Sequence, residues 1–348
     1  MNQDTAVLLL NLGTPEAPNP SAVGRYLTQF LLDPEVITGP WAFRQFLVRG
    51  IIVPFRKSKS AALYQKIWTP RGSPLAFHTQ DLVSDLQMSF TGLNVFSAFR
   101  YGNPSFEETL KEIQSLGFNN LFILPLYPQY ATSTQRTSET ELRRLRVWER
   151  FENVRFIKSY HNQDFYLDSV TKMIREKWHA GSHLVFTFHG IPEAHVTENH
   201  PGCDTCVQHD YCQKSGDVMC YKRQCTETAE ALAQRLSLSP GDWSLSFQSR
   251  LGRARWLLPS TVDKIRELTR QGKKNLTLVA PGFSADCLET MEEMDVELRE
   301  VFNHEGGQDW CRVMCLNSEP YWVDQLGRYL INQLQEMTNG TTSAQPTL

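Results

Sequence analysis

A histidine stands at the end of an apolar run in the middle of the chain. The run Leu184–Gly190 is short, rich in β-branched and aromatic residues and closed by Ile191-Pro192, which is typical of a buried parallel strand. Ligands of open α/β sheets bind outside the carboxyl ends of the strands. We therefore expect His189 to face a ligand and to serve as a proton acceptor or a metal ligand. The alternative is a structural histidine capped by a neighbouring group.

Three glutamates repeat at four-residue intervals further along the chain. Glu289, Glu293 and Glu297 follow a predicted helix start at Ser284, whose hydroxyl suits the N-cap position. This spacing stacks three like charges on one helix face, at a cost of roughly a few tenths of a kcal/mol per pair. Two interpretations stay open: a solvated acidic face, or a ladder of carboxylates that takes up protons or conducts a hard cation.

Five of the eight cysteines are concentrated in one segment, Cys203-x2-Cys206-x5-Cys212-x7-Cys220-x4-Cys225. A C-x-x-C pair followed by further cysteines is typical of a metal site, and a metal would order a loop with few apolar residues. The chain begins without the basic flank and long apolar run of a secretory signal, so we expect reduced thiols and a cytoplasmic protein. Zinc and an iron–sulfur cluster both satisfy this spacing.

Aromatic, arginine and polar side chains follow several predicted strands. They are Arg100, Tyr101, Tyr127, Gln248, Ser249 and Trp256. Rings and guanidinium groups at strand ends suit a flat apolar ligand that bears carboxylates. Each residue alone could instead belong to the core or to the rim of the site.

Two parallel sheets are the predicted elements that position these side chains. The strands expected in the first half are Ala6–Gly13, Leu93–Phe99, Leu121–Leu126 and Val154–Tyr160. Those expected in the second half are Leu184–Gly190, Ser244–Gln248, Leu276–Ala280 and Arg312–Leu316. Helical patterns such as Phe106–Leu116 and Val262–Gln271 separate the strands, which indicates the βαβ units of an α/β protein.

The two halves also resemble each other in sequence. The pattern L-x-E-I-x-x-x-G-x-x-N-L, which begins at Leu110, recurs as I-x-E-L-x-x-x-G-x-x-N-L from Ile265. Arg100-Tyr101-Gly102 likewise matches Arg250-Leu251-Gly252 in the same order along the chain. We infer two similarly folded lobes, in which His189 takes the place that Leu12 holds in the first lobe.

The length of 348 residues suggests two domains. We expect a first lobe over residues 1–160 and a second over 161–319, with the cysteine-rich insert at 193–224. A final helix at 320–337 and a polar tail at 338–348 follow. The net charge of −3 gives no electrostatic case for nucleic acid.

An apolar patch with a basic edge extends from Trp41 to Phe55. It is too short and too charged for a membrane span. One interpretation is a lip that contacts a membrane surface peripherally, and the other is a core helix with a basic edge.

Several motifs together resemble the ferrochelatase family. The most specific are Phe188-His189-Gly190-Ile191-Pro192, Phe247-Gln248-Ser249-Arg250-x-Gly252 and Pro281-Gly282-Phe283-Ser284-Ala285-Asp286-Cys287-Leu288-Glu289-Thr290. The resemblance extends from about Leu8 to Leu330. It implies two Rossmann-like lobes with a porphyrin in the cleft between them, and a final helix that packs on the first lobe. The implied activity is the insertion of ferrous iron into protoporphyrin IX, which forms protohaem in the last step of haem biosynthesis.

The resemblance also assigns residues to roles. It places His189 and Glu289 at the family's active-site pair, which would bind ferrous iron or accept protons. Glu293 and Glu297 continue the acidic line, and the implied pocket lining is Leu12, Arg100, Tyr101 and Trp256. From their strand ends we add Tyr127, Gln248 and Ser249 as porphyrin contacts.

The insert resembles that of bacterial ferrochelatases with an internal [2Fe–2S] cluster. The implied ligands are Cys203, Cys206, Cys212 and Cys220, with Cys225 left out because cluster-free relatives also have cysteine there. A structural zinc site is the alternative. Coproporphyrin as substrate, cobalt or nickel insertion into a tetrapyrrole, and an iron–sulfur redox or sensor protein are the rival functions. Monomer and homodimer both stay open.

Overall fold

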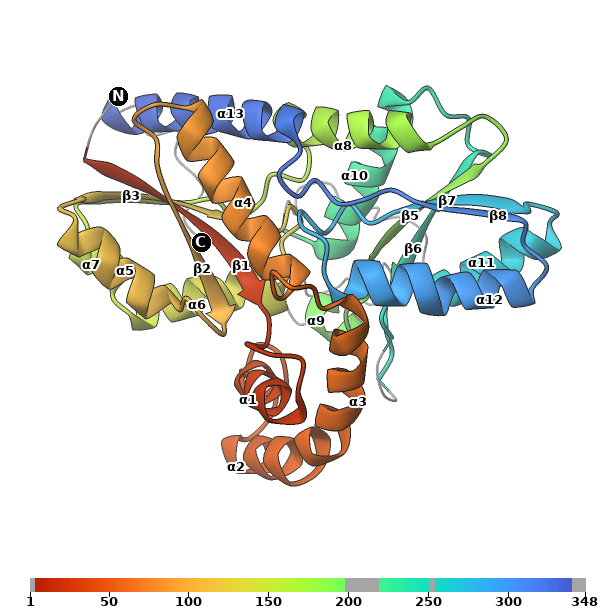
Figure 1. The fold of residues 1–348 in the computed structure, drawn as a ribbon, viewed down its shortest axis with the longest axis horizontal. Coiled ribbons are helices and arrows are strands. Elements are labelled where there is room, and N and C mark those ends of the chain that lie inside the picture. Colours follow the sequence, from red (N-terminus) through yellow and green to blue (C-terminus); the bar gives the residue numbers. More distant parts are fainter. Residues whose placement is uncertain (1–3, 198–218, 251–253, 340–348) are drawn as a thin grey trace.

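The computed structural model describes residues 4–197, 219–250 and 254–339. Within these residues, eight strands form two sheets of four strands each, and every strand pair is parallel. The first sheet has the order β2-β1-β3-β4 and the second has the corresponding order β6-β5-β7-β8. Figure 1 shows the two sheets side by side, flanked by helices. This confirms the predicted α/β fold with two similar lobes.

The strands have the following bounds. In the first sheet they are β1 (Thr5–Gly13), β2 (Asn94–Tyr101), β3 (Asn120–Pro125) and β4 (Asn153–Phe156). In the second sheet they are β5 (His183–His189), β6 (Trp243–Gln248), β7 (Asn275–Val279) and β8 (Asp309–Arg312). In each lobe the chain order reverses direction beside the first strand, and ligands of such sheets bind at that point, outside the carboxyl ends.

The helices alternate with the strands, and η marks a π-helical segment. The first half contains α1 (Pro20–Leu31), α2 (Trp41–Gln45), η1 (Phe46–Ile52), α3 (Val53–Ile67), α4 (Pro74–Ser89), α5 (Phe106–Ser115), η2 (Thr132–Arg136), α6 (Thr137–Arg144) and α7 (Val147–Arg150). The second half contains α8 (Asp164–Lys177), α9 (Glu193–Thr197), α10 (Tyr221–Arg235), α11 (Thr261–Arg270), η4 (Glu289–Leu298), α12 (Arg299–His304) and α13 (Pro320–Thr338).

Two strand predictions were wrong at their boundaries, for one physical reason. The eighth strand is Asp309–Arg312, whereas we expected Arg312–Leu316, and the fourth ends at Phe156 rather than at Tyr160. The apolar residues beyond both strands are buried, with Leu316 2% and Tyr160 1% exposed, but they lie in loops that enter the core. An apolar run therefore signalled burial correctly and strand geometry incorrectly.

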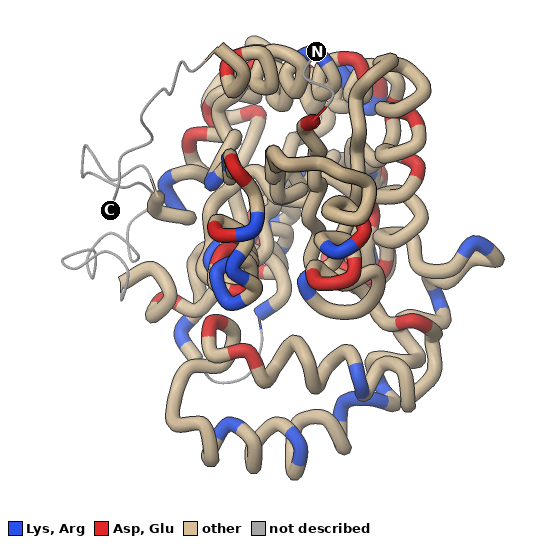
Figure 2. The backbone as a smooth tube through the Cα atoms, turned by 90° about the vertical axis from the view of Figure 1, so that its left-hand side faces the viewer, with Lys and Arg blue, Asp and Glu red and all other residues tan. Residues whose placement is uncertain are grey.

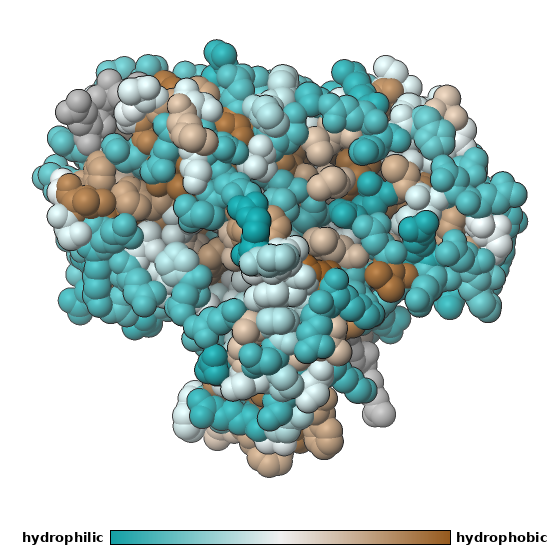
Figure 3. Space-filling view, in the orientation of Figure 1, coloured by the Kyte–Doolittle hydropathy of each residue, from teal (hydrophilic) through white to brown (hydrophobic). Residues whose placement is uncertain are grey.

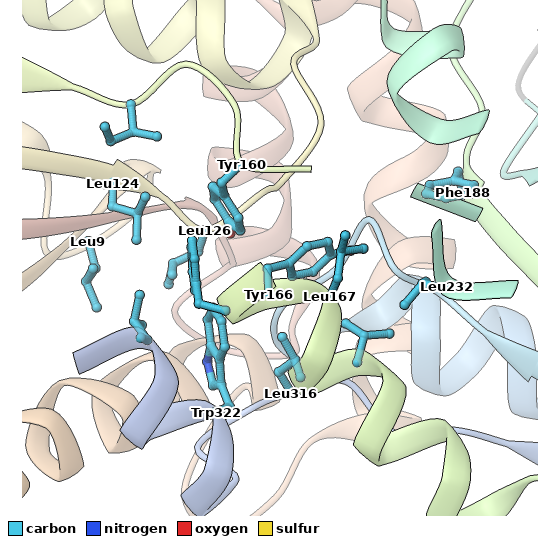
Figure 4. Close-up of a cluster of buried hydrophobic side chains, with 14 of the residues drawn as sticks. Leu9, Leu124, Leu126, Tyr160, Tyr166, Leu167, Phe188, Leu232, Leu316 and Trp322 are labelled. Carbon is cyan, nitrogen blue, oxygen red and sulfur yellow. The ribbon is translucent and has the colours of Figure 1, made fainter. Parts of the chain in front are cut away.

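One hydrophobic core joins the two lobes. Side chains alternate along β1, so that Leu9 enters this shared core while Leu8 packs on the opposite face of the sheet. Phe188 from β5 and Trp322 from α13 belong to the same shared core. Figure 4 shows Leu9, Phe188 and Trp322 among the side chains gathered between the elements of both lobes. Helix α13 packs against both α4 and α8, so it braces both lobes.

Helices α1 to α3, residues 20–67, form an arm that projects from the first lobe (Figure 1). Large apolar side chains on it are open to solvent: Trp41 (69% exposed), Phe43 (56%), Phe46 (65%), Ile51 (42%) and Phe55 (75%). The interpretation of Trp41–Phe55 as a core helix was therefore wrong for these residues. Among the described residues, no helix combines the length and apolar character needed to cross a bilayer.

Candidate functional site

His189 is the last residue of β5, at the carboxyl end of the second sheet. Its carbonyl oxygen accepts a hydrogen bond of 2.8 Å from the hydroxyl of Tyr221, the first residue of α10. Its ring makes an edge contact with Phe283, with ring centroids 6.2 Å apart. Burial lowers the pKa of the imidazole below its usual value, while the negative charge of Glu289 acts in the opposite direction. The ring is therefore neutral near pH 7 and able to accept a proton.

The glycine after His189 allows three segments to meet there. A Cβ atom on Gly190 would lie 2.6 Å from the carbonyl oxygen of Gln248 and 3.2 Å from the ring of Trp256. Only glycine fits so close to a backbone oxygen. Gly190 thus places His189 beside the end of β6 and near Trp256.

The helix that bears the glutamates begins later than predicted. Ser284 is not its N-cap, because the Ser284 hydroxyl donates a 2.5 Å hydrogen bond to the carbonyl oxygen of Leu126 in the first lobe. Asp286 pairs with Arg312 at 2.6 Å and accepts a 3.0 Å hydrogen bond from the hydroxyl of Thr290, the second residue of η4. The segment after β7 is thus a turn that connects the lobes, and η4 starts at Glu289. π-helical segments are often found at functional sites.

The three glutamates of η4 form a gradient of exposure. Glu289 and Glu293 are half-buried, whereas Glu297 is exposed. Burial raises the pKa of Glu293 to about 7, with smaller contributions from Glu289 and Glu297. Burial and the charge of Glu292 also raise the pKa of Glu297. The carboxylates thus extend from the histidine side of η4 to solvent, and one of them exchanges protons near neutral pH.

Ser249 holds the carboxylate of Glu293. The backbone N–H of Ser249 donates to Oε1 of Glu293 at 2.7 Å, and the Ser249 hydroxyl donates to Oε2. Ser249 adopts φ +67°, a left-handed conformation that is uncommon for serine and costs about 1 kcal/mol or more. This backbone conformation directs both the N–H and the hydroxyl of Ser249 toward one carboxylate. The structure thus places Ser249, predicted as a porphyrin contact, against the acidic ladder.

Gln248 connects the histidine strand to the acidic helix. Its side chain is 3% exposed. Its Oε1 accepts from the Thr187 hydroxyl at 3.0 Å, and its Nε2 donates to the carbonyl oxygen of Glu289 at 3.0 Å. Gln248 therefore fixes the position of η4 relative to β5.

Residues of the arm approach the same helix from the first lobe, and the sequence analysis missed them. Lys66 forms a 2.5 Å ion pair with Glu292, whose side chain is 3% exposed. Burial raises the pKa of Tyr26 and Tyr64 strongly, and the negative charge of Glu289 contributes to both shifts. One sequence signal pointed to Glu292: it lies three residues after Glu289, so it is next to the three glutamates on the helix. The tyrosines carried none, because their approach depends on the path of α1 and α3.

Three other predicted porphyrin contacts belong to a buried polar network in the first lobe. Arg100 pairs with Asp33 at 2.6 Å, and the hydroxyl of Tyr101 donates to the same carboxylate at 2.9 Å. The hydroxyl of Tyr127 lies 3.2 Å from that of Ser138. Tyr101 is 2% and Tyr127 8% exposed. Leu12, by contrast, is half-buried at the end of β1, where Gly13 (φ +111°) turns the chain.

Three of the four predicted cluster ligands, Cys203, Cys206 and Cys212, lie outside the described residues. The fourth, Cys220, is the N-cap residue of α10 and is 3% exposed. A thiolate at the amino end of a 15-residue helix is favoured by the helix dipole, so this position fits a metal ligand. Among residues 4–197, 219–250 and 254–339, no group of three or more His, Cys, Asp or Glu side chains is arranged to hold a metal ion.

Comparison with known proteins decides the family. The model of the family described as Ferrochelatase matches residues 4–334. The chain belongs to the ferrochelatase family. A ferrochelatase of Pseudomonas aeruginosa is 40% identical over 331 residues, covering 93% of this chain and 96% of that protein. One from Coxiella burnetii is 38% identical over 341 residues, covering 96% and 95%. These relatives confirm the predicted family and its class of enzyme.

Solved structures support the fold. SirB from Bacillus subtilis with Fe3+ superposes with a TM-score of 0.57 at 9% identity, covering 97% of this chain and 98% of that one. The sirohydrochlorin chelatase SirB from Bacillus subtilis subspecies spizizenii, in complex with cobalt, gives a TM-score of 0.52 at 10% identity, covering 96% and 94%. At such low identity this likeness shows the chelatase-like fold alone.

Proposed function

We propose that this ferrochelatase inserts ferrous iron into protoporphyrin IX and forms protohaem. The observation that carries the proposal is the neutral, half-buried His189 with a line of carboxylates that leads from Glu289 to the exposed Glu297. Metal insertion releases two pyrrole protons for each iron bound. A site for this reaction needs a neutral base at the ring and a route for protons to solvent, and His189 and the three carboxylates support this assignment.

In this mechanism His189 accepts a pyrrole proton through its imidazole. Glu289, which acts electrostatically on that ring, stabilises the imidazolium that forms. Glu293 then takes up the proton, because its pKa of about 7 allows it to be both loaded and unloaded near neutral pH. Glu297 passes the proton to water. The alternative role for His189 and Glu289 is contact with the metal substrate, because imidazole and carboxylate also suit ferrous iron.

The porphyrin would contact residues at the carboxyl ends of both sheets. We assign Leu12 and Trp256 to its apolar faces, since both are half-buried there. Arg100, Tyr101 and Tyr127 would reach a bound porphyrin only by exchanging their present partners. Gln248 and Ser249 would affect the porphyrin indirectly, because their hydrogen bonds hold η4 and its carboxylates in place.

A [2Fe–2S] cluster on Cys203, Cys206, Cys212 and Cys220 is the cofactor we propose. The sequence spacing and the position of Cys220 at the start of α10 support it. When bound, the cluster would supply an ordered anchor for the insert. Anaerobically purified protein should hold about two irons and two labile sulfides per chain. Stoichiometric zinc without sulfide would replace this proposal by a structural zinc site.

The exposed apolar side chains of the arm support a second, peripheral contact. We propose that Trp41, Phe46 and Phe55 insert into the interface of a membrane from its cytoplasmic side. Flotation of the protein with lipid vesicles tests this contact. Binding that persists after all three are replaced by serine would contradict it.

The substrate assignment is tested by an anaerobic assay of the purified protein with protoporphyrin IX and coproporphyrin, each offered Fe²⁺, Co²⁺ or Ni²⁺. We expect the highest kcat/KM with protoporphyrin IX and Fe²⁺. A preference for coproporphyrin, or for another metal, would reassign the substrate within the chelatases. Loss of the cluster without loss of chelatase activity would exclude an iron–sulfur redox function as the main one.

A further inference from the structure

A pocket of about 490 Å³ lies in the arm, between α1, η1 and α3. Its polar lining consists of hydrogen-bond donors: Ser21, Arg25, Thr28, Gln29, Arg49 and Lys57. None of the nine described residues that line it is acidic. The Thr28 hydroxyl donates to the carbonyl oxygen of Gly24 at 2.7 Å, which leaves three cations, the Ser21 hydroxyl and the Gln29 amide. Such a lining is complementary to an anion that accepts several hydrogen bonds.

Two of these cations have their charge available. Arg25 pairs with Glu16 at 2.9 Å, so its charge is partly neutralised. Arg49 and Lys57 are exposed, and within the described residues neither side chain has an ion pair or hydrogen bond. The surrounding sequence makes the electrostatic potential around the pocket more positive, because between Glu35 and Asp81 it holds seven Lys and Arg residues and no Asp or Glu. Figure 2 shows Lys and Arg along the lowest helices of the molecule.

The pocket is distinct from the iron site. Gly24 and Thr28 face the pocket. Tyr26, whose pKa is raised in part by the charge of Glu289, lies two residues from each of them on α1. Two residues correspond to about 200° of rotation around an α-helix. The pocket therefore opens on the face of α1 that points away from the acidic ladder.

The pocket shares its helices with the exposed apolar side chains. Arg49 lies in η1 between Phe46 and Ile51, and Lys57 lies in α3 two residues after Phe55. In the space-filling view of Figure 3, apolar residues gather at the lower end of the arm beside hydrophilic ones. Cations beside exposed aromatic and aliphatic side chains are typical of surfaces that bind anionic membranes.

We propose that this pocket binds the phosphate headgroup of an anionic phospholipid. Arg49, Lys57 and the hydroxyl of Ser21 hold the headgroup, while the apolar side chains of the arm enter the interface. The inference rests on the proposed membrane contact of the arm and adds a lipid preference to it. Each cation near an anionic membrane surface contributes about fivefold to binding, so the two available cations give a measurable selectivity.

The test is flotation of the full-length protein with vesicles of phosphatidylcholine alone and of phosphatidylcholine with phosphatidylglycerol. The pocket variant is Arg49→Gln with Lys57→Gln. The control, Arg270→Gln with Lys273→Gln, removes the same charge from an exposed surface of the second lobe. We expect the pocket variant to lose about tenfold or more of its affinity for anionic vesicles. Its affinity for phosphatidylcholine should not change, and the control should lose less than twofold.

The outcomes separate the two proposals. Absence of wild-type binding to either vesicle would overturn the membrane contact, and the pocket assignment with it. Binding without a preference for phosphatidylglycerol, or equal losses in the pocket variant and the control, would overturn the pocket assignment alone. Tight calorimetric binding of inorganic phosphate that both pocket substitutions abolish, without a vesicle preference, would identify a free anion instead of a headgroup. Circular dichroism and chelatase activity in detergent confirm that both variants are folded.

Discussion

The hydroxyl of Tyr221 donates a 2.8 Å hydrogen bond to the carbonyl oxygen of His189. Strand β5 pairs with β7 only as far as Phe186, so this carbonyl lies beyond the ladder on that side of the sheet. Tyr221 replaces the missing strand partner. Because Tyr221 directly follows Cys220, a predicted cluster ligand is one residue away from a side chain that holds the backbone of His189.

Replacing Tyr221 by phenylalanine should therefore disturb His189 more than it disturbs the fold. The carbonyl oxygen loses its partner, which costs about 1–3 kcal/mol if it stays buried. We expect kcat for iron insertion to fall several-fold and the melting temperature to fall by a few degrees. Tyr160→Phe is the matched control, since among the described residues the buried Tyr160 hydroxyl has no hydrogen-bond partner. Equal effects of the two variants on kcat would contradict a positioning role for Tyr221.

Ser249 should set the pH at which Glu293 exchanges protons. Burial raises the pKa of Glu293 to about 7, and the hydroxyl of Ser249, which stabilises the carboxylate, keeps it from rising further. Ser249→Ala should therefore raise this pKa further and move the acidic limb of the pH–rate profile to higher pH. Glu293→Gln should remove that limb. An unchanged limb in both variants would show that another group controls it.

Glu293 should also make stability depend on pH. Its pKa is about 7 in the folded chain and near its usual value of 4.5 in the unfolded chain, so the folded state binds the extra proton between these values. The contribution of Glu293 to the free energy of unfolding should fall as pH rises from about 4.5 through about 7. Denaturant unfolding of wild type and Glu293→Gln across this range measures the difference. If the free energy of unfolding of wild type instead increased relative to that of Glu293→Gln as pH rises, the result would contradict this prediction.

Glu297 should matter for turnover but little for stability. Its side chain is exposed, and the like charge of Glu292 is among the causes that raise its pKa. Glu297→Gln removes that repulsion, so we expect unchanged or slightly higher stability together with slower insertion at limiting iron. Glu300→Gln, two residues past η4, is the matched control. Unchanged rates in Glu297→Gln would instead support the interpretation of Glu297 as part of a solvated acidic face.

The strand that ends in His189 was predictable because its apolar run is short and bounded by Gly-x-Pro. The correspondence of the two lobes was predictable from the repeat that begins at Leu110 and Ile265, and both sheets have the same strand order. The start of η4 was not predictable, because Ser284 has the chemistry of an N-cap and yet bonds to Leu126 of the other lobe. Likewise, Tyr221 and Lys66 reach the site through tertiary packing, which leaves no local pattern in the sequence.

The central claim is that His189 accepts the protons that iron displaces from the porphyrin. It is tested most directly by comparing His189→Ala with wild type in two measurements on the same protein: porphyrin binding by fluorescence titration, and anaerobic insertion of Fe²⁺ by absorbance. We expect the variant to bind porphyrin within a few-fold of wild type, because truncation at a strand end is tolerated, while insertion falls by about 10²-fold or more. Insertion at a near-normal rate by His189→Ala would contradict the account.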